Sequence, residues 1–310
     1  MDTISCKAKQ FIVFLIKLLI VGAAFYFIYD QLAHNNKLDW VKFHHLLWEK
    51  QSFWGILFLL SFSVANRYFE ILKWQNLVTF IRPITVGEAA KQVLSALTAG
   101  IFTPNGLGEY AGKAMYFEKK KTKKVIFLNL ICNGIQMLLT VIFGTIGLWM
   151  LGYKFWTLGI LGISIFIIGL SFLSKSITFK GYSIEKLLHK INEIPKSIHR
   201  KNIILAIARY LVFSHQYYFL FLAFDVDLPY PTLIASIATV YFLASSLPSF
   251  QFLDFAVKGS VALFFFEPLG VNEWIIVFVA TLMWFLNVVL PVVIGSYYVL
   301  KFKPKWKSSP

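Results

Sequence analysis

An acid and a base lie inside a strongly apolar stretch. They directly follow a segment where proline and glycine are expected to break the helix and form a turn. Glu109 and Lys113 follow the run Thr-Pro-Asn-Gly-Leu-Gly at 103–108. Their spacing permits an ion pair on one helix face. The start of such a helix, with free N–H groups and a positive dipole end, can instead bind an anion or a polar head group. Glycines would leave the backbone open to that ligand. The candidate binding residues of this turn and pair are Pro104, Asn105, Gly106, Gly108, Glu109 and Lys113.

A weaker copy of the pattern occurs later in the chain. Pro248 precedes Asp254 and Lys258, which have the same spacing as the first pair. The segment 250–252 reads Phe-Gln-Phe, so this turn lacks glycines and is bulkier and more apolar. We therefore add Pro248, Asp254 and Lys258 to the candidate binding residues.

Two arginines lie within apolar segments, where ionisable groups are expensive to place. Arg67 is followed by Glu70 and Lys73 at helical spacing, which permits an internal ladder of ion pairs. Alternatively, Arg67 lies deep enough to bind an anionic head group, since the guanidinium binds phosphate bidentately. Arg209 is the equivalent candidate in the later segment, although it can also extend towards the nearby basic loop.

Further polar residues have simpler structural interpretations. Asn129, Asn133 and Gln136 share one face of an expected helix, where hydrogen bonds between helices are favoured over a wet groove. Thr85 and Glu88 have the spacing of a capping box and predict a helix start.

The composition predicts an all-α polytopic membrane protein. The 310 residues are 58% hydrophobic, the mean hydropathy is +0.67, and the apolar runs are long enough to cross about 30 Å of hydrocarbon. We expect about six full transmembrane helices, at 11–30, 53–80, 125–150, 157–174, 202–224 and 274–300.

Two more apolar regions, 86–118 and 232–267, are each broken by a proline-containing turn. Their second halves hold only about 11 and about 15 residues, too few to span the bilayer core. We therefore expect two re-entrant helical hairpins.

The placement of the positive charges, which give a net charge of +15, supports this topology. The lysines cluster between apolar runs, as at 119–124, which is typical of cytoplasmic loops. The hairpin arrangement places these clusters and both termini on the cytoplasmic side of the plasma membrane. The two hairpins then enter from opposite sides. We expect one integral domain, 1–310, built as an inverted repeat of about 53–150 and about 202–300 joined by a linker helix and basic loop, 157–201.

The same charge pattern bears on partners and chemistry. Contact with anionic lipid head groups is expected, whereas nucleic-acid binding is not, because no soluble domain exists to carry it. The sequence has no nucleophile elbow, Walker loop, His-Glu-x-x-His or paired-cysteine zinc pattern. We therefore expect no cofactor, no metal site and no catalytic residue. His215, inside an apolar run, is a candidate proton relay.

The arginine-containing helix, the Thr-Pro-Asn-Gly-Leu-Gly-Glu-Tyr-Ala-Gly-Lys turn and the later Ser-Ser-Leu-Pro segment resemble the flippase-type transmembrane domain of the lysylphosphatidylglycerol synthase family. The resemblance covers about 10–300. It departs from the family at Phe250, Phe252 and Asp254, where the family tends to have glycines and a glutamate. The soluble synthase domain is absent, so the resemblance implies lipid translocation without lipid synthesis.

Three functions fit these patterns. The first is a flippase that moves a phospholipid or lipid-linked intermediate between leaflets. The second is a membrane enzyme that acts on a lipid phosphate or glycosyl carrier and uses Glu109 as acid or base. The third is a non-transporting scaffold of envelope synthesis.

Overall fold

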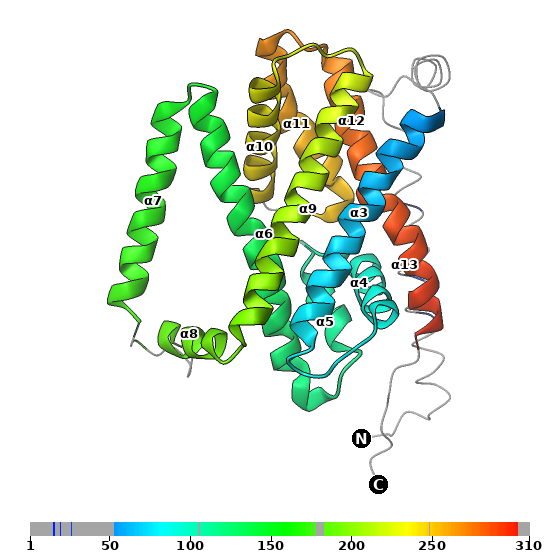
Figure 1. Ribbon diagram of the computed structural model, residues 1–310, viewed down its shortest axis with the longest axis vertical. Helices are drawn as coiled ribbons and strands as arrows, with labels where there is room; N and C mark the ends of the chain where they lie inside the picture. Colours follow the sequence, from blue (N-terminus) through cyan, green and yellow to red (C-terminus); the bar gives the residue numbers. More distant parts are fainter. Residues whose placement is uncertain are drawn as a thin grey trace.

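The computed structural model describes residues 53–302 except 105, 176, 178–182 and 248, together with Leu15, Leu19 and Tyr26. The expected span 11–30 and the candidates Asn105 and Pro248 lie outside the described residues. The described chain is helical (Figure 1). Its α-helices are α3 (Phe53–Val78), α4 (Val86–Gly100), α5 (Leu107–Ala114), α6 (Thr122–Met150), α7 (Lys154–Leu173), α8 (Ile184–Asn192), α9 (Lys196–Ala223), α10 (Tyr230–Ser246), α11 (Asp254–Phe266), α12 (Glu273–Trp284) and α13 (Leu290–Lys301).

Five of the described helices are long and apolar enough to cross a membrane. They are α3, the helix Lys119–Met150 that contains α6, α7, α9, and the continuous helix Glu273–Lys301 that contains α12 and α13. Each has at least 20 residues, which at 1.5 Å per residue matches about 30 Å of hydrocarbon. The chain is therefore an all-α membrane protein, as the composition predicts.

Each of the two broken regions forms two shorter helices. In the first, α4 begins with the predicted capping box, in which the Thr85 hydroxyl accepts from the Glu88 N–H and the Glu88 side chain accepts from the Thr85 N–H. It has 15 residues and α5 has 8. In the second region, α10 has 17 residues and α11 has 13. All four helices are shorter than the ~20 residues of a typical span.

Glycines let these helices approach their neighbours closely. A Cβ atom at Gly112 of α5 would lie 2.9 Å from the Ala96 Cα of α4. A Cβ at Gly147 of α6 would lie 2.5 Å from the Ala235 carbonyl oxygen of α10, and one at Gly295 of α13 would collide with α4. Small residues commonly serve this purpose between membrane helices, where close packing replaces hydrophobic burial as the driving force.

The helix contacts form matching sets. The central pair is α3 and α9, which cross side by side (Figure 1). Around it, α4 packs against α5 and α13, and α5 packs against α6. Correspondingly, α10 packs against α11 and α6, and α11 packs against α12. If α3, α4, α5 and α6 are exchanged with α9, α10, α11 and the helix of α12 and α13, the contact of α3 with α9 maps onto itself and each of the other contacts maps onto another.

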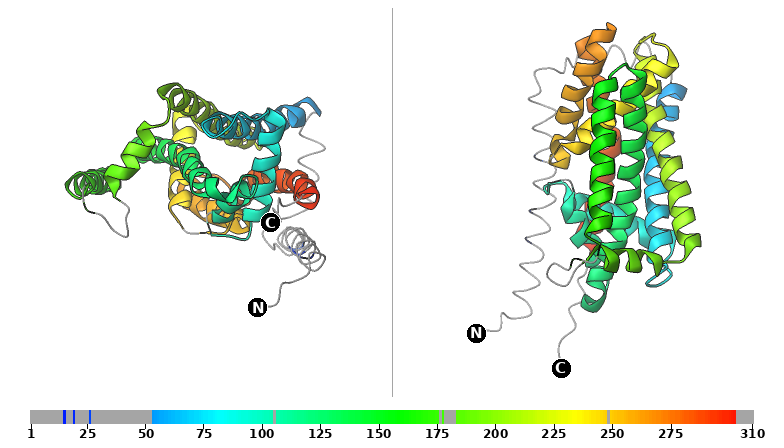
Figure 2. Two further views of the ribbon diagram at one scale, coloured as in Figure 1. Left: turned by 90° about the horizontal axis from the view of Figure 1, so that it is seen from below. Right: turned by 90° about the vertical axis from the view of Figure 1, so that its left-hand side faces the viewer.

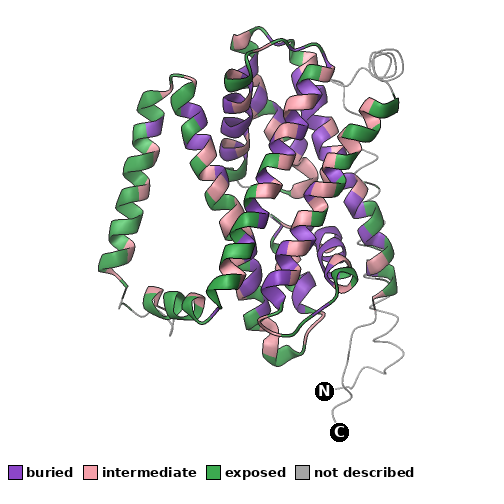
Figure 3. Cartoon of the chain, viewed as in Figure 1, coloured by how far each residue is buried: buried purple, intermediate pink, exposed green. Residues whose placement is uncertain are grey.

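The buried apolar residues form three clusters that follow the same division. One lies among α9, α10, α11 and α12, and a second among α3, α4 and α6. The third joins the groups and includes Ile101 after α4, Phe255 of α11 and Trp284 of α12. Figure 3 shows the buried residues concentrated on α4, α10 and the inner faces of their neighbours.

The segment between the two groups differs from the rest. Helix α7 stands away from the bundle and packs mainly against α6 (Figure 2), and Thr157 is its one buried residue. The segment expected as a basic loop contains α8, whose first turn is capped by the Ser183 hydroxyl. Helix α9 then begins at Lys196, earlier than the expected residue 202, because Pro195 ends the preceding turn and can precede a helix.

Candidate functional site

The two predicted turns meet at the centre of the molecule. Pro104 of the first turn and Phe250 of the second form an antiparallel backbone bridge. The Gln251 side-chain amide donates to the Glu109 carboxylate at 2.7 Å. The Trp284 indole N–H donates to the Gln251 carbonyl at 3.1 Å. Sequence reasoning placed both turns but gave no sign that they contact each other.

The start of α5 differs from our expectation of free N–H groups. The backbone N–H of Gly108 donates to the Thr103 hydroxyl at 2.7 Å, and that of Glu109 donates to the Gly106 carbonyl at 2.9 Å. The N–H groups of Gly106 and Leu107 are also bonded within the turn. The glycines are needed for the backbone conformation and for close packing: Gly106 has a φ of 67°, and Gly108 lies against α4. The expectation that they expose the backbone to a ligand is therefore wrong for this structure.

The predicted ion pair between Glu109 and Lys113 is also replaced by other contacts. The Lys113 ammonium is fully buried and donates to the Asn129 side-chain oxygen at 2.6 Å. It also lies 4.8 Å from the centre of the Trp74 ring, a distance at which a cation is attracted to an aromatic face. Within the described ranges, no carboxylate lies within ion-pair distance of Lys113. It is thus a buried cation held by an amide and an indole.

Glu70 is the main anion between α3 and α9. An Arg209 guanidinium nitrogen lies 2.9 Å from its carboxylate and the Lys73 ammonium lies 3.5 Å from it. The predicted contact of Glu70 with Lys73 is therefore confirmed. Arg209 does not extend towards the basic loop, because it bonds Glu70 and also donates to the Asn66 side-chain oxygen at 3.0 Å.

Arg67 lies beside this cluster. Its hydrogen-bond partner is not Glu70, as the expected ladder of ion pairs would require. Arg67 donates to the Asn287 backbone carbonyl at 2.6 Å. That carbonyl is available because Pro291, four residues later, has no N–H to donate to it. Asn287 lies in the short π-helix Phe285–Val289, and such irregular turns often occur at functional sites. The spacing of asparagine and proline in an apolar helix was the sequence signal for this contact.

Side-chain amides extend the cluster along α3 and α9. Asn66 donates to the Asn287 side-chain oxygen at 2.6 Å, and Asn287 donates to Gln216 at 2.9 Å. Gln216 in turn donates to the Ser63 hydroxyl at 2.6 Å. Sequence reasoning did not assign Asn66, Ser63 or Asn287 to the site.

The second turn has a closed ion pair. The Lys258 ammonium lies 2.6 Å from the Asp254 carboxylate, and both side chains are 24% exposed. Lys258 also lies 4.9 Å from the centre of the Tyr241 ring. The predicted pairing is confirmed here, in contrast to the first turn.

The side chains between the two turns and helices α3, α6 and α9 form a polar centre that has more cations than carboxylates. Apart from the closed pair, two carboxylates, Glu70 and Glu109, face four cationic side chains: Arg67, Lys73, Lys113 and Arg209. All four cations lie within electrostatic range of Glu70. Among the described residues of this centre, three buried N–H donors have no partner, Arg67 Nε, Asn129 Nδ2 and Gln136 Nε2, and so does one acceptor, Gln251 Oε1. Such a centre is suited to a ligand that carries negative charge and accepts hydrogen bonds.

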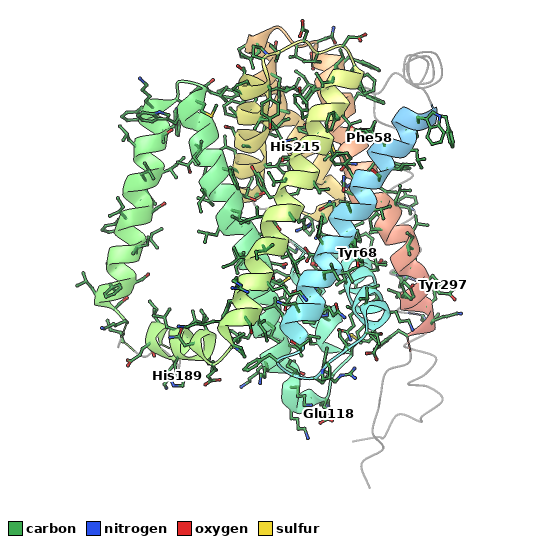
Figure 4. All side chains as sticks on the ribbon, viewed as in Figure 1. Phe58, Tyr68, Glu118, His189, His215 and Tyr297 are labelled. Carbon is green, nitrogen blue, oxygen red and sulfur yellow. The ribbon has the colours of Figure 1, made fainter. Side chains whose placement is uncertain are left out.

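The amides predicted on one face of α6 bond neighbouring helices, as expected. Asn133 donates to the Tyr110 hydroxyl at 3.3 Å, and Gln136 accepts from Lys73 at 3.2 Å. His215 lies away from the centre (Figure 4), where it contacts the Tyr230 hydroxyl at 3.0 Å. Among the described residues, no group of three metal-binding side chains gathers.

The fold and site define an all-α membrane protein with a buried, cation-rich polar centre. No protein-family model matches the chain, and no curated protein matches it. The resemblance to the lysylphosphatidylglycerol synthase family therefore stays a prediction.

Proposed function

We propose that this protein moves a lipid with an anionic head group between the two leaflets of the membrane. The observation that carries this proposal is the surplus of cations over carboxylates around Glu70, two of them fully buried, together with three buried N–H donors among the described residues that lack a partner. Buried charges in membrane segments are costly and usually mark a route for a polar substrate. A phosphate-bearing head group would supply the missing negative charge while its acyl chains stay in the bilayer.

The proposal includes a topology. We infer that α4–α5 and α10–α11 are re-entrant hairpins that enter from opposite sides, with the termini and the lysines of 119–124 in the cytoplasm. The exchange pattern of helix contacts and the short lengths of these four helices support an inverted repeat. Transporters commonly bind substrate near the midplane, between broken helices of two such repeats.

In this mechanism, Arg67 and Arg209 hold the phosphate, and the contact between Glu109 and Gln251 opens as the head group passes. Arg67 has an unpartnered Nε atom in addition to its bond to Asn287, so it can bind an oxyanion without losing its existing partner. The single hydrogen bond from Gln251 to Glu109 is weak enough to break, since a hydrogen bond to a charged group contributes about 1.5–3 kcal/mol net.

The test is lipid exchange in liposomes reconstituted with the purified protein. We expect a labelled short-chain anionic lipid to change leaflet at a rate that Arg67→Gln lowers about tenfold or more, because a charged hydrogen bond to phosphate is lost. Glu109→Gln should also lower the rate. Arg200→Gln is the matched control, because Arg200 is an exposed arginine at the cytoplasmic end proposed for α9. Wild-type rates in both site variants would refute the proposal.

A further inference from the structure

A hollow outside the polar centre lies between α4, the end of α5 and the end of α13. Its volume is about 550 Å³, within the range of ligand pockets. The residues that shape its chemistry are Lys91, Met115, Tyr116, Tyr297 and Lys301. Figure 4 labels Tyr297 towards the lower end of α13, in the lower half of the view, where Glu118 and His189 lie on other elements.

The hollow presents positive charge and hydrogen-bond donors. Lys301 donates to the Tyr297 hydroxyl and lies 4.4 Å from the centre of its ring. Because that hydroxyl accepts from Lys301, its own proton is free to donate. The Lys91 side chain is exposed, and no hydrogen bond or ion pair joins its ammonium to another described residue. No acidic residue is among the described residues that line the hollow. An anion therefore fits it best.

An apolar stripe on α13 leads to this hollow. Val293, Tyr297 and Leu300 recur at helical spacing and are 42%, 53% and 46% exposed, and the adjacent Ile294 is 54% exposed. In a membrane protein this stripe faces hydrocarbon, and tyrosines next to it are typical of the bilayer interface. The stripe and the hollow together match the acyl chain and head group of one lipid.

We propose that the hollow binds the phosphate of an anionic phospholipid, with Lys91 and Lys301 as its cationic ligands and an acyl chain along α13. The apolar stripe favours a lipid over a free phosphate ion, which would need the lysines alone. This binding does not depend on translocation, because the hollow is built by residues other than those of the polar centre.

The test is native mass spectrometry of the full chain in detergent, titrated with phosphatidylglycerol, phosphatidylcholine or inorganic phosphate. We expect saturable binding of phosphatidylglycerol in preference to phosphatidylcholine. The double variant Lys91→Gln/Lys301→Gln should bind it about 100-fold more weakly, since each lost charged contact costs about tenfold. The control Lys196→Gln/Lys201→Gln removes two exposed lysines from α9 and should change binding less than about threefold.

Met115→Trp tests whether the lipid binds in the hollow itself or only to the positive charge of the surface. Met115 is 59% exposed, so tryptophan can fill the hollow without disturbing the core, and both lysines are retained. We expect this variant to lose phosphatidylglycerol binding. Equal binding of the two lipids, equal effects of the two lysine variants, or unchanged binding in Met115→Trp would each overturn the proposal. Displacement of the lipid by inorganic phosphate at equal concentration would assign the hollow to free phosphate instead.

Discussion

Replacing Glu70 with glutamine should destabilise the protein by about 3–5 kcal/mol, because it leaves buried cations without their anion. The Glu70 side chain is 7% exposed, with Arg209 at 2.9 Å and the fully buried Lys73 at 3.5 Å. At an effective dielectric constant of about 20, these two attractions are worth about 6 and about 5 kcal/mol before the cost of desolvation. Glutamine retains the shape of the side chain but removes its charge.

The matched comparison is Asp254→Asn, which removes a carboxylate from a shorter but more exposed ion pair. That pair has a separation of 2.6 Å, and both of its side chains are 24% exposed. Because this pair is less buried than Glu70 and Lys73, the loss of one partner leaves the other charge less completely desolvated, and the cost should be well below that of Glu70→Gln. Burial, rather than distance, should therefore decide which substitution is costly.

The free energy of unfolding can be measured by titrating the protein in mild detergent with a denaturing detergent and following tryptophan fluorescence. We expect Glu70→Gln to lose several times more stability than Asp254→Asn. The double variant Glu70→Gln/Arg209→Gln should be more stable than the sum of the single changes predicts, because the two residues interact directly. A loss below about 1 kcal/mol for Glu70→Gln, or a larger loss for Asp254→Asn, would show that the cluster is not held by this anion.

Other predictions follow from packing and topology. Gly295→Ala should destabilise the protein by about 1–3 kcal/mol, because its Cβ collides with α4. Gly159→Ala on α7 should be neutral or stabilising, since nothing lies within 4 Å of its Cβ. Equal effects of the two substitutions on thermal unfolding would contradict this prediction. In a cysteine-free background, Lys121→Cys and Glu267→Cys should react with an impermeant reagent from opposite sides of the membrane, and labelling from the same side would exclude the inverted repeat.

Local chemistry made part of this fold predictable. Pro104 and Gly106 mark the first broken region, and the short apolar runs on either side predict helices too short to span. The pattern of Thr85 and Glu88 predicted the start of α4, which the structure confirms. Each of these inferences depends on residues a few positions apart, where spacing alone fixes which groups can meet.

Contacts between distant segments were not predictable in this way. The bond from Gln251 to Glu109, the bond from Arg209 to Glu70 and the bridge at Pro104 depend on how the helices pack. The pair Glu109 and Lys113 shows the limit of spacing as evidence. Four residues permit an ion pair, but Lys113 bonds Asn129 on α6.

The two turns therefore differ in how their charges are held, and this difference bears on mechanism. In the second turn, Asp254 and Lys258 neutralise each other on one helix, so separating the two turns need not expose an unpaired charge there. In the first, Glu109 bonds across to Gln251 of the second turn, and separating the two turns removes that partner. Opening would then leave a carboxylate beside the cations of the centre at the moment when an anionic head group competes for them. The first turn is thus the one whose carboxylate loses a partner when the two turns separate.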